Sequence, residues 1–432
     1  MLIYAALGTF SLAFLLIVFD VFDKALIAML GALVMIILRI ITPEEAIAAI
    51  SFETILLLLA MMTLVNIASK SGIFNWISVK IASLTKGNPL AIFLLFSFLT
   101  AVSSAFLDNV TTVILIVPLT IELVKGMGKD PKPYIFAEMM FSDMGGALTL
   151  IGDPSNILIG GASGLSFMQF IQNLWIPILF SSILTAVAFV VVFWKKLKPI
   201  SKDLGELFVA NVIIERIKHR YLRKTLHKDF VIKVVIALLI TMLGFFFQEY
   251  IGLPNYVIAF TAAVILGIVT SKRVNIVHTL ESVEWTTLLF FSGLFIMVAG
   301  VEKTGILFKL SEWISNSTTD ITYLSLMILW ISGGVSMVLN NVPFITVMLP
   351  VIASIQLSFG EQDSTMLWWA LSMGTCLGGN ATIVGSSANV VSVDLAHKEG
   401  VHISFLEYLK FSLPLTIGVL SICSAYIILK LN

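Results

Sequence analysis

The chain has 432 residues, of which 58% are hydrophobic and only 12% are charged. Soluble domains carry about 25% charged residues, so this composition excludes a soluble globular protein and indicates an all-α, polytopic membrane protein. The formal net charge is zero, which gives no reason to expect nucleic-acid binding.

Ten apolar segments are long enough, or nearly so, to cross the bilayer core. We expect spans at 2–19, 25–41, 53–68, 135–165, 173–194, 230–248, 254–271, 286–301, 364–394 and 411–429. Two more apolar stretches, 89–124 and 321–358, are interrupted by polar residues, so each is one long span or a re-entrant helical hairpin. The amphipathic segments 73–86 and 306–315 are expected to lie along the membrane interface.

The placement of basic residues favours two hairpins over two more spans. With ten spans, two hairpins and a cytoplasmic linker 195–229, the Lys and Arg residues left outside are Arg39, Lys303, Lys309 and Lys430. This split follows the positive-inside rule. We therefore expect two inverted repeats, 1–194 with a cytoplasmic hairpin and 230–432 with an outer hairpin. Both termini then lie on the outer side of the cell (inner) membrane.

The stretch 145–156, GGALTLIGDPSN, lies in an apolar segment but contains three glycines and a proline. Glycine costs about 1 kcal/mol and proline about 3 kcal/mol per helical position, so the helix should break here. The stretch 378–389, GGNATIVGSSAN, repeats five of the twelve residues 233 positions later. Two broken helices in matching halves indicate the binding site of a transporter. The residues expected at the backbone breaks are Gly145, Gly146, Gly152, Gly378, Gly379 and Gly385.

Two carboxylates fall inside apolar segments, Asp108 in the first interrupted stretch and Asp153 in the first broken helix. A carboxylate at the bilayer centre costs at least about 2.5 kcal/mol, so each is a candidate for function. Such a group can alternate between holding a proton and holding Na⁺, although each could also cap the half-helix that follows it. The matching positions in the second half are the neutral Asn340 and Ser386. This difference predicts ion coupling in the first half.

Amides and hydroxyls recur at the same tips and breaks, and we expect them to line a polar cavity between the halves. They are Asn109, Thr111, Thr149, Ser155, Asn156, Asn341, Thr382, Ser386 and Asn389. Half-helix N-termini there would favour an anion and freed carbonyls a cation. The alternative role is hydrogen bonding between helices, worth about 0.6 kcal/mol.

Several other residues are weaker candidates. Asp143 lies before the first break and is either a proton-relay group or part of a vestibule. Glu138 is expected to be solvated, and Glu53, Glu249 and Glu284 are expected at span ends near the interface. The two cysteines, Cys376 and Cys423, are too few for a cysteine-rich metal site, and packing is their expected role. We expect neither a metal site nor a cofactor.

Four motifs carry a resemblance to a known family: SAFLDNVTT at 104–112, VEWTTLLFF at 283–291, and the two break stretches. They are similar to the ion-transporter superfamily, most closely to its branch of ArsB-type arsenite permeases and the P protein. NhaD-type antiporters and divalent-anion/sodium symporters belong to the same superfamily. The resemblance implies a homodimer with a scaffold domain and a transport domain that moves as an elevator, with hairpin tips meeting the broken helices at the substrate site.

In the divalent-anion symporters both hairpin tips carry a Ser-Asn-Thr motif, from which Asp108 and Pro343 depart here. A dicarboxylate would meet an added negative charge. The sequence therefore predicts proton-coupled export of a small inorganic solute, with arsenite or antimonite first. The alternatives are a Na⁺/H⁺ antiporter, and an anion channel or other anion transporter of the dicarboxylate type. No enzymatic activity is expected. The sequence lacks a Gly-x-x-x-x-Gly-Lys-[Ser/Thr] motif, so pumping would draw on an ion gradient or a separate ATPase subunit.

Overall fold

The computed structural model describes residues 2–18, 22–198, 227–318, 320–339, 341–359 and 361–431, which form helices and no strands. Asn340 and most of the linker 195–229 lie outside the described residues. In the described part, the helices long and apolar enough to cross a membrane are α4 (Phe52–Lys70), α7 (Asn109–Gly126), α10 (Phe167–Val192), α13 (Lys228–Phe246), α17 (Trp285–Glu302) and α23 (Phe405–Leu431). Shorter apolar helices are α1 (Leu2–Val18), α2 (Lys24–Ile37), α6 (Pro89–Ser104), α15 (Asn255–Thr270), α19 (Ile321–Ser336) and α20 (Asn341–Phe359).

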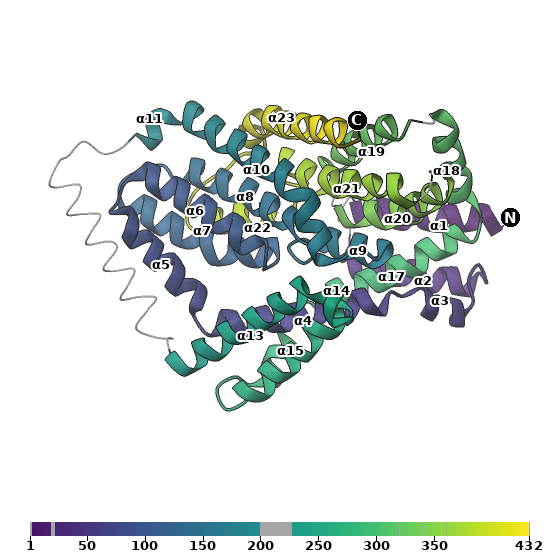
Figure 1. Ribbon diagram of the computed structural model, residues 1–432, viewed down its shortest axis with the longest axis horizontal. Coiled ribbons are helices and arrows are strands. Elements are labelled where there is room, and N and C mark those ends of the chain that lie inside the picture. Colours follow the sequence, from purple (N-terminus) through teal and green to yellow (C-terminus); the bar gives the residue numbers. More distant parts are fainter. Residues whose placement is uncertain are drawn as a thin grey trace.

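One set of helices, which we call the scaffold group, comprises α1 to α4 and α13 to α17. Within it α17 packs against α2 and α1, while α4 packs against α15 and α13 along the lower edge of Figure 1. Its short members are α3 (Pro43–Ala49), α14 (Gln248–Ile251) and α16 (Ile276–Glu281). Thus α17 of the second half packs among helices of the first half, and α4 of the first half packs among helices of the second half.

The contacts of the short scaffold helices recur between the halves. Lys303, at the end of α17, binds Glu45 of α3 at 2.7 Å. Lys70, at the end of α4 and 233 positions earlier, donates to Thr279 of α16 at 3.0 Å. The same position in each half therefore ties a long helix to a short helix of the other half.

The remaining helices, which we call the hairpin group, contain two helix pairs and two broken helices. The pairs are α6 with α7 and α19 with α20. The broken helices are α8 (Lys132–Leu148) with α9 (Pro154–Ser163), and α21 (Glu361–Gly378) with the 3₁₀ turn η1 (Gly379–Ala381) and α22 (Ser387–Lys398). The long helices α10 and α23 pack together along the upper edge of Figure 1, followed by α11 (Trp194–Leu197) after α10.

The two groups are joined by α5 (Ile73–Thr85) and α18 (Ile306–Ser317), which cover the segments expected at the membrane interface. Each helix follows a glycine in the left-handed conformation, Gly72 at φ +76° and Gly305 at φ +75°. Only glycine adopts this conformation without a steric cost. The helices therefore start at equivalent bends in the two halves.

Both broken helices are interrupted inside the predicted stretches, at 149–153 and 382–386. Not all six predicted glycines lie at the interruption, however. The helix continues through Gly145, Gly146 and Gly378, and Gly379 opens the 3₁₀ turn, whereas Gly152 and Gly385 lie in the non-helical segments. The earlier glycines instead allow close packing, since a Cβ on Gly378 would lie 2.5 Å from the carbonyl oxygen of Gly333.

The hairpin group interlocks the two halves. The first parts of the broken helices pack on the hairpin of their own half, α8 on α6 and α21 on α19. The second parts pack on the hairpin of the other half, α9 on α20 and α22 on α7. The two tips and the two breaks therefore meet near one point.

Candidate functional site

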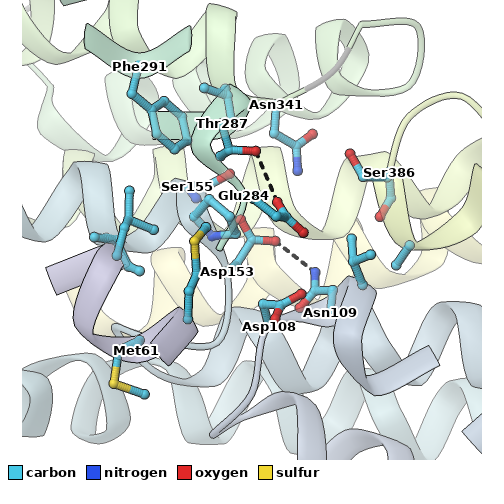
Figure 2. A pocket seen from close by; sticks show the side chains of 18 of the residues that line it. Met61, Asp108, Asn109, Asp153, Ser155, Glu284, Thr287, Phe291, Asn341 and Ser386 are labelled. Carbon is cyan, nitrogen blue, oxygen red and sulfur yellow. Dashed lines mark hydrogen bonds between the residues drawn. The ribbon is translucent and has the colours of Figure 1, made fainter. Parts of the chain in front are cut away.

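A cavity of about 350 Å³ opens where the tips and breaks meet the scaffold group. Its polar lining comes from both groups of helices: Lys24, Asp108, Asn109, Asp153, Ser155, Glu284, Thr287, Asn341, Ser386 and Ser387. Most of these residues are labelled in Figure 2. The scaffold side adds an apolar wall that includes Met61 and Phe291. Of the predicted site residues, Asp108, Asn109, Asp153, Ser155, Asn341, Gly385 and Ser386 lie at this cavity.

Asp108 both lines the cavity and caps α7. One carboxylate oxygen accepts the backbone N–H of Thr111 at 2.8 Å, and the other accepts the Thr111 hydroxyl at 2.5 Å. A carboxylate at a helix N-terminus satisfies free backbone donors and interacts favourably with the helix dipole. Thr111 was predicted to line the cavity, but it serves this cap instead.

Asp153 starts α9 and is 5% exposed. Its Oδ1 accepts the backbone N–H of Ser155 at 2.8 Å, and its Oδ2 accepts the Asn109 amide at 2.8 Å. The same Asn109 Nδ2 donates to Asp143 Oδ1 at 3.0 Å. Asn109 therefore links one carboxylate at the cavity with a second one behind it.

Asp143 joins the two halves. It is 1% exposed on α8, and its Oδ1 accepts the hydroxyl of Ser386 at 2.8 Å. Ser386 occupies the position in the second break that Asp153 occupies in the first. The second break, which has a serine where the first has an aspartate, thus donates a hydrogen bond to Asp143 of the first half.

Four predicted site residues brace the breaks rather than face the cavity. Thr149 and Thr382 accept the N–H groups of Gly152 and Gly385 at 3.1 and 3.0 Å. Their hydroxyls donate to backbone carbonyls of the hairpin tips. Asn156 donates to the carbonyl of Thr149 at 2.9 Å, and Asn389 donates to that of Thr382 at 3.0 Å. They were expected to line the cavity, but they are not among its lining residues, and their hydroxyls and amide N–H groups instead bind backbone groups freed by the break.

Three residues at the cavity escaped the sequence analysis or were placed elsewhere by it. Glu284 precedes α17, as expected of a span end, but it lines the cavity and accepts the Thr287 hydroxyl at 3.0 Å. Thr287 and Lys24 line the same space. The signal for Glu284 was present in the motif VEWTTLLFF, whose acidic residue directly precedes an apolar span.

The other weak candidates lie away from the cavity. Glu138 is 1% exposed and accepts the Thr120 hydroxyl at 2.5 Å, so the expectation that it is solvated was wrong. Glu53 and Glu249 line a separate cavity of about 410 Å³. The thiol of Cys376 is buried 3.7 Å from the Asn156 side-chain oxygen.

Residues 14–374 match the family model described as CitMHS, citrate transporter. A 46 kDa membrane protein of Mycobacterium leprae is 33% identical over 431 residues, covering 98% of each chain. An uncharacterised transporter of Mycobacterium tuberculosis is 31% identical with the same coverage. The human P protein is 28% identical over 96% of this chain and 59% of its own length. The solved structure of the Alcanivorax borkumensis YdaH transporter has a similar fold, with a TM-score of 0.53, 15% identity and coverage of 87% of this chain and 83% of that one.

Proposed function

This chain belongs to the CitMHS citrate transporter family, and we propose that it is a secondary transporter that exports a small solute in exchange for protons. The matches confirm the predicted resemblance to the ion-transporter superfamily. They also make the chain a multi-pass membrane transporter and not an enzyme. The solute, its coupling ion and the mode of movement are the proposal.

The observation that carries the proposal is the charge of the cavity. Asp108 and Asp153 from the hairpin group and Glu284 from the scaffold group face the same space (Figure 2), and these three carboxylates outnumber the one lysine, Lys24, among its described lining residues. Like charges in a confined site disfavour one another, so bound protons or cations relieve their repulsion. We infer that solute binding is linked to a proton at these carboxylates.

The neutral part of the lining supports an uncharged solute. Asn109, Asn341 and Ser386 present amides and a hydroxyl to the cavity. The Ser155 hydroxyl is fully buried and has no hydrogen-bond partner among the described residues. Arsenite and antimonite are small hydroxides that are mostly neutral at neutral pH, so we propose them as the first candidates. Free citrate, named in the family description, would meet three carboxylates and one lysine, Lys24, so its binding needs further neutralising cations.

The same three carboxylates favour Na⁺/H⁺ antiport as the second candidate. A site that binds either a proton or Na⁺ requires carboxylate oxygens, and added hydroxyl oxygens are suitable Na⁺ ligands. In this reading no further solute is needed. The two candidates therefore differ in whether proton flux depends on a solute.

Purified protein in liposomes with an internal pH dye tests these readings. Proton flux that depends on arsenite supports the first proposal, flux driven by Na⁺ alone supports antiport, and flux that depends on citrate favours the activity in the family description. Current that follows voltage without proton movement contradicts all coupled readings.

Two variants test the assignment of the site. Asp108→Asn and Asp153→Asn should each abolish coupled flux. Asp394→Asn is the matched control, because Asp394 pairs with Lys398 on α22 at an exposed position. Coupled flux that survives both cavity substitutions contradicts the assignment.

We further infer that the hairpin group moves against the scaffold group in a homodimer in the cell (inner) membrane. The cavity lies between the two groups, and each group contributes charged residues to it. Movement of one group would carry Asp108 and Asp153 past Glu284 and Lys24, which would change the charge balance around a bound solute. Both termini on the outer side and a cytoplasmic linker 195–229 belong to the same proposal.

A further inference from the structure

The repeat relates two buried contacts in the hairpin group that differ in chemistry. Asp143 and Cys376 are 233 positions apart, as are Asn156 and Asn389. In one contact, the Cys376 thiol lies 3.7 Å from Asn156 Oδ1, and Ser372 donates to the same oxygen at 2.6 Å. The equivalent pair of residues is Asp143 of α8 and Asn389 of α22, two helices that pack together.

The amide of Asn389 can have only one orientation. Its Nδ2 donates to the carbonyls of Thr382 at 3.0 Å and Gly379 at 3.4 Å. Carbonyl oxygens only accept, so the nitrogen must face the break and Oδ1 must face away from it. Asn389 is fully buried, and its Oδ1 has no hydrogen-bond partner in the described part of the chain.

Asp143 Oδ2 is a second buried acceptor without a hydrogen-bond partner among the described residues. The other carboxylate oxygen, Asp143 Oδ1, takes both available donors, Asn109 and Ser386. The residue equivalent to Ser372 is Met139, so the hydroxyl that serves Asn156 is missing on this side.

Nearby hydroxyl and thiol groups are already engaged. The Tyr408 hydroxyl interacts with both Asp143 and the Asn389 side chain, but it donates its single proton to the carbonyl of Asn380 at 2.9 Å. Among the described residues, the titratable groups that interact with Asp143 are Asp153, Cys376 and Tyr408, and none of these three is a cation. One proton shared between Asp143 Oδ2 and Asn389 Oδ1 is the simplest way to satisfy both acceptors.

We propose that Asp143 carries this proton on Oδ2 and donates it to Asn389 Oδ1. The inference rests on the proposed function for its role, because it places the coupling proton one layer behind the solute cavity. Asn109 donates to both Asp143 and Asp153, so ionisation of either carboxylate changes the strength of its hydrogen bond to the Asn109 amide. Solute arriving at Asp153 is thereby linked to the proton on Asp143.

Infrared difference spectroscopy of the purified protein tests where the proton lies. Wild type is expected to show the C=O stretch of a protonated carboxylic acid at neutral pH, and Asp143→Asn to lose it. Asp153→Asn and the exposed Asp394→Asn should retain this band. Glu138→Gln assigns any separate band from that buried carboxyl, whose Oε2 also has no partner among the described residues. A spectrum of Asp143→Asn that retains every acid band of wild type overturns the proposal.

Transport by the same variant tests the role of the proton. An amide at position 143 can accept from Asn109 and Ser386 and donate to Asn389, so the contact should persist without a titratable proton. We expect Asp143→Asn to retain its thermal unfolding temperature and solute exchange at equal pH, and to lose transport driven by a pH gradient. Gradient-driven transport at the wild-type rate would contradict the assigned role. If wild type transports no tested solute, the proposed function fails, while the infrared result still decides the site of the proton.

Discussion

The clearest constraints at the scale of single residues are steric. A Cβ on Gly152 would lie 2.6 Å from the carbonyl oxygen of Ser104, and one on Gly385 would lie 2.7 Å from that of Ser336. Both obstacles are backbone atoms of a hairpin tip, which cannot rotate away. These glycines therefore set how closely each break approaches its tip.

Replacing Gly152 by alanine should destabilise the protein by about 1–3 kcal/mol, the usual cost of overpacking. Gly334→Ala is the matched control, because Gly334 lies inside α19 with no atom within 4 Å of an added Cβ. It should be neutral or stabilise by up to about 1 kcal/mol. Thermal unfolding in detergent measures both variants. Equal unfolding temperatures for the two would show that the break is not tightly packed.

Substitution of Ser155 should affect solute binding without affecting the stability of the fold. Because it has no partner among the described residues, Ser155→Ala loses no hydrogen bond within the protein, and the free energy of unfolding should change by less than about 0.5 kcal/mol. If the hydroxyl contacts solute, the KM for transport should rise about tenfold, which corresponds to about 1.4 kcal/mol. Uptake titrations in liposomes measure this change. An unchanged KM would remove Ser155 from the site.

At the scale of elements, an ion pair tethers α11 to the loop before α8. Asp130 accepts Lys196 Nζ at 2.6 Å and the backbone N–H of Lys132 at 3.1 Å. Burial raises the pKa of Asp130, but these hydrogen bonds outweigh it, and its pKa lies below the ordinary value of 3.8. The folded state therefore favours the ionised carboxylate.

This tether gives a pH dependence of defined sign. A lowered pKa in the folded state contributes stability above the pKa of the unfolded chain, and that stability is lost as the pH falls through the folded value. The loss should therefore begin below about pH 4. The side chains of Lys196 and Asp130 are 48% and 35% exposed, so solvent screens the pair. Its contribution to the free energy of unfolding is therefore less than about 1 kcal/mol.

Unfolding temperatures measured between about pH 7 and pH 3 test the tether. Asp130→Asn should remove this part of the acid sensitivity. Asp394→Asn serves as the control, since its pair with Lys398 lies within one helix and joins no two elements. Identical acid profiles for wild type and Asp130→Asn would exclude a contribution from the tether.

At the scale of the whole molecule, the scaffold and hairpin groups also meet outside the cavity. Ser166, at the start of α10, donates to Glu249 of α14 at 3.0 Å. If the hairpin group moves, this contact must open during transport. By comparison, Trp330 of α19 donates to Ser424 of α23 at 3.0 Å within the hairpin group.

A short bis-methanethiosulfonate cross-linker, which links two thiols through reducible disulfides, applied to the pair Ser166→Cys and Glu249→Cys should arrest transport, and reduction should restore it. The same reagent on Trp330→Cys and Ser424→Cys should leave transport intact, because both residues would move together. Solute flux before and after reduction is the measurement. Full transport through the first cross-link would contradict movement of one group against the other.

The sequence was sufficient to predict what backbone chemistry dictates locally. Glycine and proline weaken helices regardless of context, so the interruptions at 149–153 and 382–386 were foreseeable. Asp108 and Asp153 stood out because a carboxylate in an apolar segment needs a special environment.

What escaped prediction depends on packing between the halves. Glu284 reads as an ordinary span end, and the helix orientation that turns it toward Asp153 is set by contacts of α17 with α2 and α4. Asn156 and Asn389 share residue type with Asn109, yet the fold uses them as braces. A single sequence does not distinguish an amide that holds backbone carbonyls from one that faces solute.

The crossing of α9 onto α20 and of α22 onto α7 also governs how the protein is made. When the ribosome has finished α9, the helix on which α9 will rest has not yet been synthesised, and about 180 residues separate the end of one from the start of the other. Contacts between such distant segments form late and slowly. The newly inserted first half must therefore wait in the bilayer until α20 has been synthesised before the contact between α9 and α20 can form.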